Sequence, residues 1–277
     1  MDKQFQVNKD KCISCGLCVK DCSTMAIKMG DDNKPYMSQN GNSRCMACQH
    51  CLAICPVGAI SIQGKNAENS TLYSELSSEQ TLLAIKNRRS CRNYKTEDVS
   101  LETIEKLKEM LNYVPTGRNN HDLLFSITNT RKETDVIRNI VCKKLLKLIR
   151  FFPFSLAAKK YSRYTKLLKN GTDIIFRNAP HVIVACSPID APCADVDPII
   201  ALSYFELYAN SLGLGTCWCG LAQNCFKIIP EMKKFFNIPK GYKPVYVMLF
   251  GYPSLNYIRH TQPIAYTFVN PDANCIN

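Results

Sequence analysis

Two runs of cysteines near the start of the chain are the residues whose type and spacing point most directly to chemistry. The runs are CISCGLCVKDC and CMACQHCLAIC, and each spaces its four cysteines by two, two and three residues. They contain Cys12, Cys15, Cys18 and Cys22, and Cys45, Cys48, Cys51 and Cys55. Thiolates crowded on one tight loop are soft ligands for an iron–sulfur cluster or for zinc. Zinc ribbons use separated C-x2-C pairs, so the runs of four favour iron–sulfur clusters.

Residues 1–65 resemble a bacterial ferredoxin with two [4Fe–4S] clusters. The segments CSTMAIKM and CPVGAISI match in length and put Ala26-Ile27 opposite Ala59-Ile60, where each is predicted to open a short strand. In such ferredoxins the fourth cysteine of each run ligates the other cluster. The resemblance therefore implies two crossed ligand sets, Cys12, Cys15, Cys18 with Cys55, and Cys45, Cys48, Cys51 with Cys22. Ser23 follows Cys22 where the family has proline. We expect this difference at most to shift the reduction potential of a cluster.

The composition indicates a globular protein with more than one domain. The chain has 277 residues, of which 46% are hydrophobic and 21% are charged, and a domain of about 100–200 residues is usual. The N-terminal residues MDKQFQVNKDK lack the apolar region of a secretory signal, and no apolar run approaches the roughly 20 residues of a membrane-spanning helix. We therefore expect a soluble cytoplasmic protein, in which closely spaced cysteines bind metal and do not form disulfides. The eight cysteines outside the two runs show no metal spacing, and most are expected to be buried thiols.

A polar linker at 66–76 is predicted to separate the ferredoxin domain at 1–65 from a second domain at 77–277. The second domain opens with a capping box, Ser77 with Gln80, and the predicted helix ends at a basic cluster that includes a hydroxyl. The cluster consists of Arg88, Arg89, Ser90 and Arg92. Guanidinium groups bind phosphate oxygens through paired charge-assisted hydrogen bonds, although a basic helix end is also a common solvated feature. Four predicted elements follow along the chain: a second helix capped by Ser100, the loop VPTGRNNHD, the strand APHVIVAC and an apolar helix ended by Gly213.

From about residue 77 to 262 the chain resembles the nitroreductase family of FMN-dependent oxidoreductases. The matching segments occur in the family's order, and they are RRSCRNY, PTGRNNH, APHVIVAC, LGLGTCWCG and GYP with a later arginine. The resemblance implies an α+β fold, with a mixed sheet packed with helices and FMN at the interface of a homodimer. As a whole the chain looks like the subgroup in which a ferredoxin precedes the nitroreductase.

The resemblance also implies which residues bind FMN. The phosphate would be held by Arg88, Ser90, Arg92 and Arg259, with Arg89 alongside. The loop residues Pro115, Thr116, Gly117 and Asn119 would reach the FMN bound mainly by the other subunit. Gly220 and Leu221 stand where backbone amides approach the isoalloxazine, with Leu221 replacing a common glycine. His121 stands where the family often has glutamine.

The expected function is that of an iron–sulfur flavoenzyme. Two clusters would pass electrons to FMN, which would reduce a nitroaromatic, quinone-like or other electron-poor small molecule, with NAD(P)H or a separate reduced ferredoxin as donor. Two alternatives stay open, a dehydrogenase or dehalogenase acting on a specific metabolite and a non-catalytic electron carrier or redox sensor. The sequence contains no arrangement for nucleophilic catalysis, so no catalytic side chain is predicted, and the Gly213–Gly215 pair lacks the third glycine of a dinucleotide fingerprint.

The segment 143–169 is strongly basic. It holds nine Lys or Arg residues and no acid, with leucines and aromatic residues between them. Its position between the loop and the next strand favours a lid over the flavin or a partner surface. Contact with a membrane surface or with nucleic acid is the less favoured interpretation.

Overall fold

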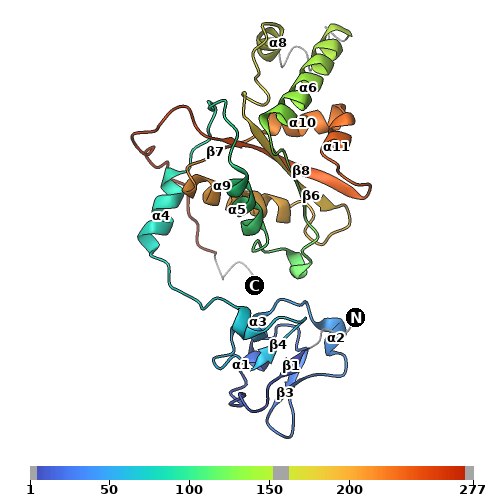
Figure 1. Ribbon diagram of the computed structural model, residues 1–277, viewed down its shortest axis with the longest axis vertical. Coiled ribbons are helices and arrows are strands. Elements are labelled where there is room, and N and C mark those ends of the chain that lie inside the picture. Colours follow the sequence, from blue (N-terminus) through green and yellow to red (C-terminus); the bar gives the residue numbers. More distant parts are fainter. Residues whose placement is uncertain (1–4, 152–161, 272–277) are drawn as a thin grey trace.

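The computed structural model describes residues 5–151 and 162–271. The chain forms a small N-terminal domain and a large domain, joined by an extended segment (Figure 1). Helices and antiparallel sheets occur in both, so the predicted α+β class is confirmed.

The small domain consists of two short hairpin-like sheets with three one-turn helices. Strand β1 (Gln6–Val7) pairs with β4 (Ile60–Ser61), and β2 (Ile27–Met29) pairs with β3 (Pro35–Met37), both antiparallel. The helices are α1 (Leu17–Lys20), α2 (Gly41–Arg44) and α3 (His50–Ala53). The strands predicted to open at Ala26-Ile27 and Ala59-Ile60 are present as β2 and β4, and each begins at the isoleucine. Ile27 and Ile60 lie in the core of this domain with Leu52, Cys18 and Cys51.

The connection to the large domain is exposed. A single 3-10 turn, η1 (Ala67–Asn69), is followed by residues without regular structure and then by α4 (Ser78–Asn87). Ser77 caps α4 as predicted, its hydroxyl accepting the Gln80 N–H at 3.5 Å. No residue of α4 is buried. Its apolar side chains Leu82, Leu83 and Ile85 are each about half exposed.

The large domain is built on an antiparallel sheet in the order β5-β6-β8-β7. The strands are β5 (Leu124–Ile127), β6 (His181–Pro188), β7 (Gly215–Trp218) and β8 (Tyr242–Gly251). Side chains alternate between the two faces of a strand, and β6 is buried on both, with Val182 and Val184 in one cluster and Ile183 and Ala185 in the other. The sheet is therefore the middle layer of three.

Helices cover both faces of the sheet (Figure 1). The helices α5 (Leu101–Leu111) and α9 (Asp197–Ser211) pack on one face, and α6 (Arg131–Phe151), α10 (Gly220–Ile228) and α11 (Glu231–Phe235) lie on the other. Ser100 caps α5 as predicted, accepting the Thr103 N–H at 3.2 Å. Past the end of α9, Gly213 has a φ of 78°, a left-handed conformation that glycine adopts without strain.

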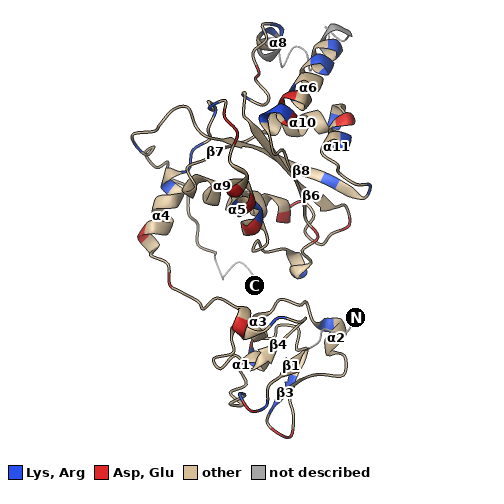
Figure 2. Ribbon diagram, viewed as in Figure 1, with Lys and Arg blue, Asp and Glu red and all other residues tan. Residues whose placement is uncertain are grey.

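The predicted basic segment 143–169 spans the outer part of α6 and the helix α8 (Ser162–Lys169). Figure 2 shows Lys and Arg along both helices. Residues 152–161 of the segment lie outside the described residues, so the predicted lid remains a prediction. Among the described helices, none combines the length and apolarity needed to cross a bilayer.

Candidate functional site

The eight cysteines of the two runs surround two separate small cavities. One cavity is lined by Cys12, Cys15, Cys18 and Cys55, here named the first cysteine set. The other is lined by Cys22, Cys45, Cys48 and Cys51, the second cysteine set. These are the crossed groupings that the ferredoxin resemblance implies, although their role as ligands remains a prediction. Within the described ranges, no three Cys, His, Asp or Glu side chains converge on a point where one metal ion would sit.

The two cysteine loops repeat each other residue by residue. Ser14 and Ala47, which occupy equivalent places, have φ values of 59° and 57°. Gly16 and Gln49, also equivalent, have φ values of 72° and 61° and precede the helices α1 and α3. Left-handed backbone at non-glycine residues costs free energy and persists where the surroundings impose it. The repetition indicates that both loops are shaped for the same kind of group.

Backbone amides point at the sulfurs that cross between the loops. Ala26 N–H donates to Cys22 Sγ at 3.3 Å, and Ala59 N–H donates to Cys55 Sγ at 3.2 Å. Hydrogen bonds of this kind favour the thiolate over the thiol and tune the potential of a cluster. Burial raises the pKa of the Cys51 thiol to about 12, so a positively charged metal centre is needed to keep this sulfur ionised near neutrality. The donor set is thus soft, sulfur-only and suited to iron.

The predicted phosphate-binding residues lie in a segment held against the edge of the large sheet. Cys91 N–H donates to the Thr216 carbonyl at 2.7 Å, and Ser90 forms a parallel bridge with the same residue of β7. Arg88, Arg89 and Ser90 are half-buried, whereas Arg92 and Arg259 are exposed.

The tail after β8 returns to the end of α4. His260 Nε2 and Asn87 Oδ1 lie 2.8 Å apart, and Tyr94 forms a bridge with Pro253. This contact places Arg259 and Arg88, which are far apart in the sequence, on neighbouring stretches of chain. The structure therefore brings together the two segments that the resemblance assigned to one phosphate.

A buried acid that the sequence interpretation missed orients Arg88. Glu206, on α9, is 5% exposed and accepts three hydrogen bonds. The donors are Arg88 Nη1 at 3.1 Å, Thr216 Oγ1 at 3.2 Å and Trp218 Nε1 at 3.0 Å. One arm of the guanidinium is thereby fixed, and within the described part of the chain its other N–H groups are left to bind a ligand. The signal was present in the sequence, as the single acid within the apolar run IIALSYFELYANSLG.

The 115–121 loop contains η2 (Gly117–Asn119) and is fixed at several points. Gly117 N–H donates to Asp197 Oδ2 at 2.9 Å, and Asp197 is buried. A Cβ at Gly117 would lie 2.6 Å from Cys193 Sγ, so a side chain here would force the loop to move. His121 N–H donates to Thr116 Oγ1 at 3.0 Å, while Pro115 is exposed. The sequence did not single out Asp197 or Cys193, because neither is close to the loop along the chain.

The last two predicted FMN contacts open a helix. Gly220 and Leu221 are half-buried and form the first turn of α10, directly after β7. Cys219 caps this helix, its sulfur accepting the Ala222 N–H at 3.4 Å. Among the described residues, no hydrogen bond joins Gly220 or Leu221 to the 115–121 loop or to the phosphate-site arginines, so their role as FMN contacts remains a prediction.

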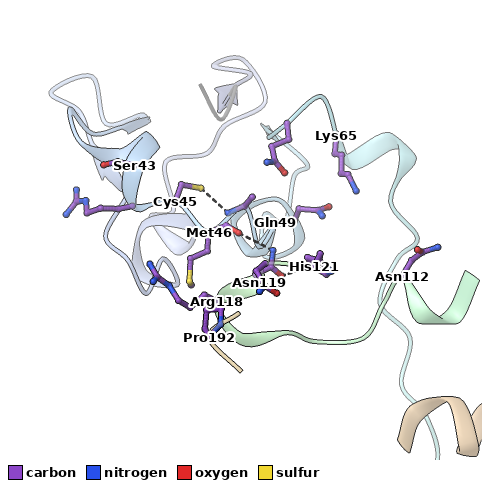
Figure 3. Close-up of a pocket in the computed structure, with 14 residues that line it drawn as sticks. Ser43, Cys45, Met46, Gln49, Lys65, Asn112, Arg118, Asn119, His121 and Pro192 are labelled. Carbon is purple, nitrogen blue, oxygen red and sulfur yellow. Dashed lines mark hydrogen bonds between the residues drawn. The ribbon is translucent and has the colours of Figure 1, made fainter. Parts of the chain in front are cut away.

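A large polar cavity of about 980 Å³ lies between the two domains (Figure 3). The small domain contributes Cys45, Met46, Ala47 and Gln49 of the second cysteine loop, and the large domain contributes the 115–121 loop. Asn119 bridges them, with Nδ2 donating to the Met46 carbonyl at 3.1 Å and Oδ1 lying 2.9 Å from His121 Nε2.

Comparison with protein families identifies both domains of the chain. Residues 85–252 match the model of the nitroreductase family, and residues 5–62 match that of the 4Fe-4S dicluster domain. A ferredoxin from Pyrobaculum islandicum is 36% identical over 55 residues, which cover 20% of this chain and 49% of the ferredoxin. The chain thus spans about half the length of this curated relative.

The large domain is also similar to solved structures. An FMN-bound nitroreductase from Desulfitobacterium hafniense has 23% sequence identity and a TM-score of 0.55, covering 70% of this chain and 100% of that one. An FMN-dependent nitroreductase from Mycobacterium smegmatis in complex with NADPH has 16% identity and a TM-score of 0.52, covering 64% of this chain and 89% of that one. At these identities the likeness shows the fold.

Proposed function

The chain belongs to the nitroreductase family and carries a 4Fe-4S dicluster domain ahead of it, and we propose that it is an iron–sulfur flavoenzyme that reduces an electron-poor small molecule, such as a nitroaromatic or a quinone. The observation that carries the proposal is the presence, in one chain, of two cavities that each collect four cysteines and of a domain with the nitroreductase fold. A ferredoxin domain delivers single electrons, and FMN can accept them singly and release them in pairs.

The chain's own residues supply the binding of each group. The first and second cysteine sets would hold one [4Fe–4S] cluster each, with amide N–H groups directed at Cys22 and Cys55. On the large domain, Arg88, Ser90, Arg92 and Arg259 would bind the FMN phosphate. Arg88 suits this role because Glu206 fixes one arm of its guanidinium and leaves the rest unused in the described contacts. The cationic segment fits a dianionic phosphate by charge and by hydrogen-bond geometry.

A homodimer is part of the proposal. On α4, Leu82, Leu83 and Ile85 are 49%, 48% and 52% exposed. Their spacing is nevertheless typical of a helix whose apolar face is buried against other protein. The tail adds more apolar surface, with Ile264 at 82% and Phe268 at 91%. Large exposed apolar surfaces mark protein interfaces. A second copy of the chain would cover α4 and the tail, and it would place the 115–121 loop of one subunit near the FMN of the other.

The electron donor is proposed to be NAD(P)H or a separate reduced ferredoxin. The FMN-dependent nitroreductase from Mycobacterium smegmatis forms a complex with NADPH, which supports the first donor. The two clusters support the second, because they exchange electrons one at a time. Reduction trials with NADH, NADPH and reduced ferredoxin on the anaerobic protein separate these donors by the bleaching of the flavin and cluster absorbance.

Metal, sulfide and flavin analysis after strictly anaerobic purification tests the cofactor content. We expect about eight iron and eight sulfide per chain, as two cubane clusters require. One FMN should accompany them, and a nitro compound should be turned over with one of the donors. Zinc in place of iron, or a protein that carries the clusters but reduces no acceptor, would contradict the flavoenzyme proposal.

Replacing both Arg88 and Arg259 by alanine tests the phosphate site. Each arginine would contribute charge-assisted hydrogen bonds of roughly 1.5–3 kcal/mol, so the double variant should retain its iron and lose its yellow flavin on purification. Flavin titration of the apo-protein measures the effect, and the matched control is alanine at Lys20 and Lys240, two exposed cations of the two domains. Unchanged FMN affinity in the arginine variant would mean that these are ordinary solvated charges.

A further inference from the structure

The two cysteine loops are equivalent in backbone but not in their surroundings. Ala47 and Gln49 of the second loop line the inter-domain cavity, whereas Ser14 and Gly16 of the first loop line a cavity formed by small-domain residues. Two equivalent cysteine residues differ in the same sense. Cys15 is exposed, while its equivalent, Cys48, is half-buried. The pseudo-symmetry of the small domain is therefore broken by the large domain.

A hydrogen bond connects the second loop to the large domain at the residue after Cys45. The Met46 carbonyl accepts the Asn119 Nδ2–H at 3.1 Å, and Figure 3 shows this bond at the centre of the inter-domain cavity. The Asn119 backbone is in the left-handed region, with a φ of 54°, and its side chain is held from behind by His121. Asn119 belongs to the loop predicted to reach the flavin. The second cysteine loop and the 115–121 loop are thus joined by a direct hydrogen bond.

The first cysteine set has exposed apolar residues beside it. Next to the exposed Cys15, Ile13 is 61% exposed and Leu17 is 36% exposed. Exposed apolar side chains beside a redox centre suit transient contact with an electron-donating partner, because such contacts need a small surface that desolvates easily.

From this asymmetry we propose that the two clusters would work in a fixed order. The first cysteine set would hold the cluster that takes single electrons from a one-electron protein donor, such as a reduced ferredoxin, and the second set would hold the cluster that passes them across the Met46–Asn119 contact to the FMN that the 115–121 loop approaches. The inference rests on the proposed function. In each step one cluster loses one electron and the next centre gains it, with no bond formed or broken. Two such steps, with two protons from water, complete one two-electron reduction of the flavin. Electron transfer slows steeply with distance, so the cluster nearest the flavin loop determines the final step.

Selective removal of one cluster at a time tests the order. The variants are Cys15→Ser and Cys48→Ser, which replace equivalent ligands of the two sets, each expected to halve the iron content. A light flash with a deazaflavin photoreductant reduces the holoprotein, and flavin absorbance then follows the reduction of FMN. The phase of this reduction whose rate does not depend on protein concentration is electron transfer within the protein. We expect this intramolecular phase to persist in Cys15→Ser and to be lost in Cys48→Ser. Loss in Cys15→Ser, or an equal effect in both variants, would overturn the proposed order.

A second pair of variants keeps all cysteines, in case loss of a ligand unfolds the small domain. Ala47 and Ser14 are equivalent, half-buried and left-handed, so Ala47→Trp and Ser14→Trp impose similar local strain. Only Ala47→Trp inserts a bulky side chain into the inter-domain cavity. We expect it to slow the intramolecular phase by at least an order of magnitude while Ser14→Trp does not. Equal rates in the two variants would refute the order. FMN and iron are measured first in every variant, and a wild-type protein without FMN would instead contradict the proposed function.

Discussion

At the scale of single residues, the large domain depends on one buried carboxylate. Glu206 is the shared acceptor for Arg88, Thr216 and Trp218, which come from the end of α4 and from β7. A buried donor that loses its acceptor keeps its desolvation cost without compensation. The same side chain therefore contributes both to the stability of the domain and to the orientation of the proposed phosphate ligand.

Replacement of Glu206 by alanine tests both contributions. We expect the free energy of unfolding to fall by about 2 kcal/mol and FMN affinity to weaken, because Arg88 loses its fixed orientation. The measurements are urea unfolding followed by far-UV circular dichroism and flavin titration. Glu231→Ala is the matched control, since Glu231 pairs with Lys144 at an exposed site, where loss of an ion pair costs about 0–1 kcal/mol. Equal effects of the two substitutions would show that burial of Glu206 is unimportant.

At the scale of elements, His181 at the start of β6 contacts residues at the start of α5, at the end of β5 and on β8. Its Nε2 accepts the Val99 N–H at 2.8 Å, next to the start of α5, and its Nδ1 lies 2.9 Å from the Thr128 carbonyl at the end of β5. The ring also stacks on Phe250 of β8, with 5.1 Å between centroids. The acceptor role of Nε2 requires the neutral ring. Burial lowers the pKa of His181, and this outweighs the raising effects of the Thr128 carbonyl, Asp98 and Glu133.

This lowered pKa predicts a pH dependence of stability. Below the ordinary histidine pKa of about 6.5, the unfolded chain binds a proton that the folded chain does not bind, so the folded state loses stability as the pH falls. The advantage of wild type over His181→Gln should therefore be full at pH 7 and should shrink towards pH 5. Urea midpoints at three pH values measure it, with His50→Gln, at an exposed position, as control. A difference that stays constant with pH would contradict a neutral buried His181.

At the scale of the whole molecule, exposed apolar surface on α4 and the tail indicates association. A charge placed in a buried apolar contact must be desolvated, so Leu82→Glu with Leu83→Glu should convert the dimer to monomer and should weaken FMN binding at the interface. Sedimentation velocity at several concentrations measures the mass. Tyr36→Glu, at a half-exposed position in the small domain, is the control and should leave the mass unchanged. A wild-type protein that sediments as a monomer at all concentrations would remove the dimer from the proposal.

The sequence by itself determined the features that depend on local spacing. The cysteine runs, the strands at Ile27 and Ile60, and the caps at Ser77 and Ser100 are each encoded within a few residues, because ligand loops, strands and helix ends are set by local geometry. The α+β class followed from the two family resemblances. The family resemblance rested on short motifs in sequence order, and the family match now supports it.

The tertiary structure alone decided which distant groups meet. The hydrogen bonds of His260 with Asn87 and of Asn119 with Met46 join residues that are 173 and 73 positions apart along the chain. No local sequence pattern specifies such pairs. The roles of Glu206 and Asp197 also emerged only on folding, because burial and hydrogen-bond partners are properties of the packed chain. The equal spacing of the two cysteine runs makes the clusters look interchangeable in the sequence. Apart from Ser23 in place of proline after Cys22, they become different because the large domain packs against one loop.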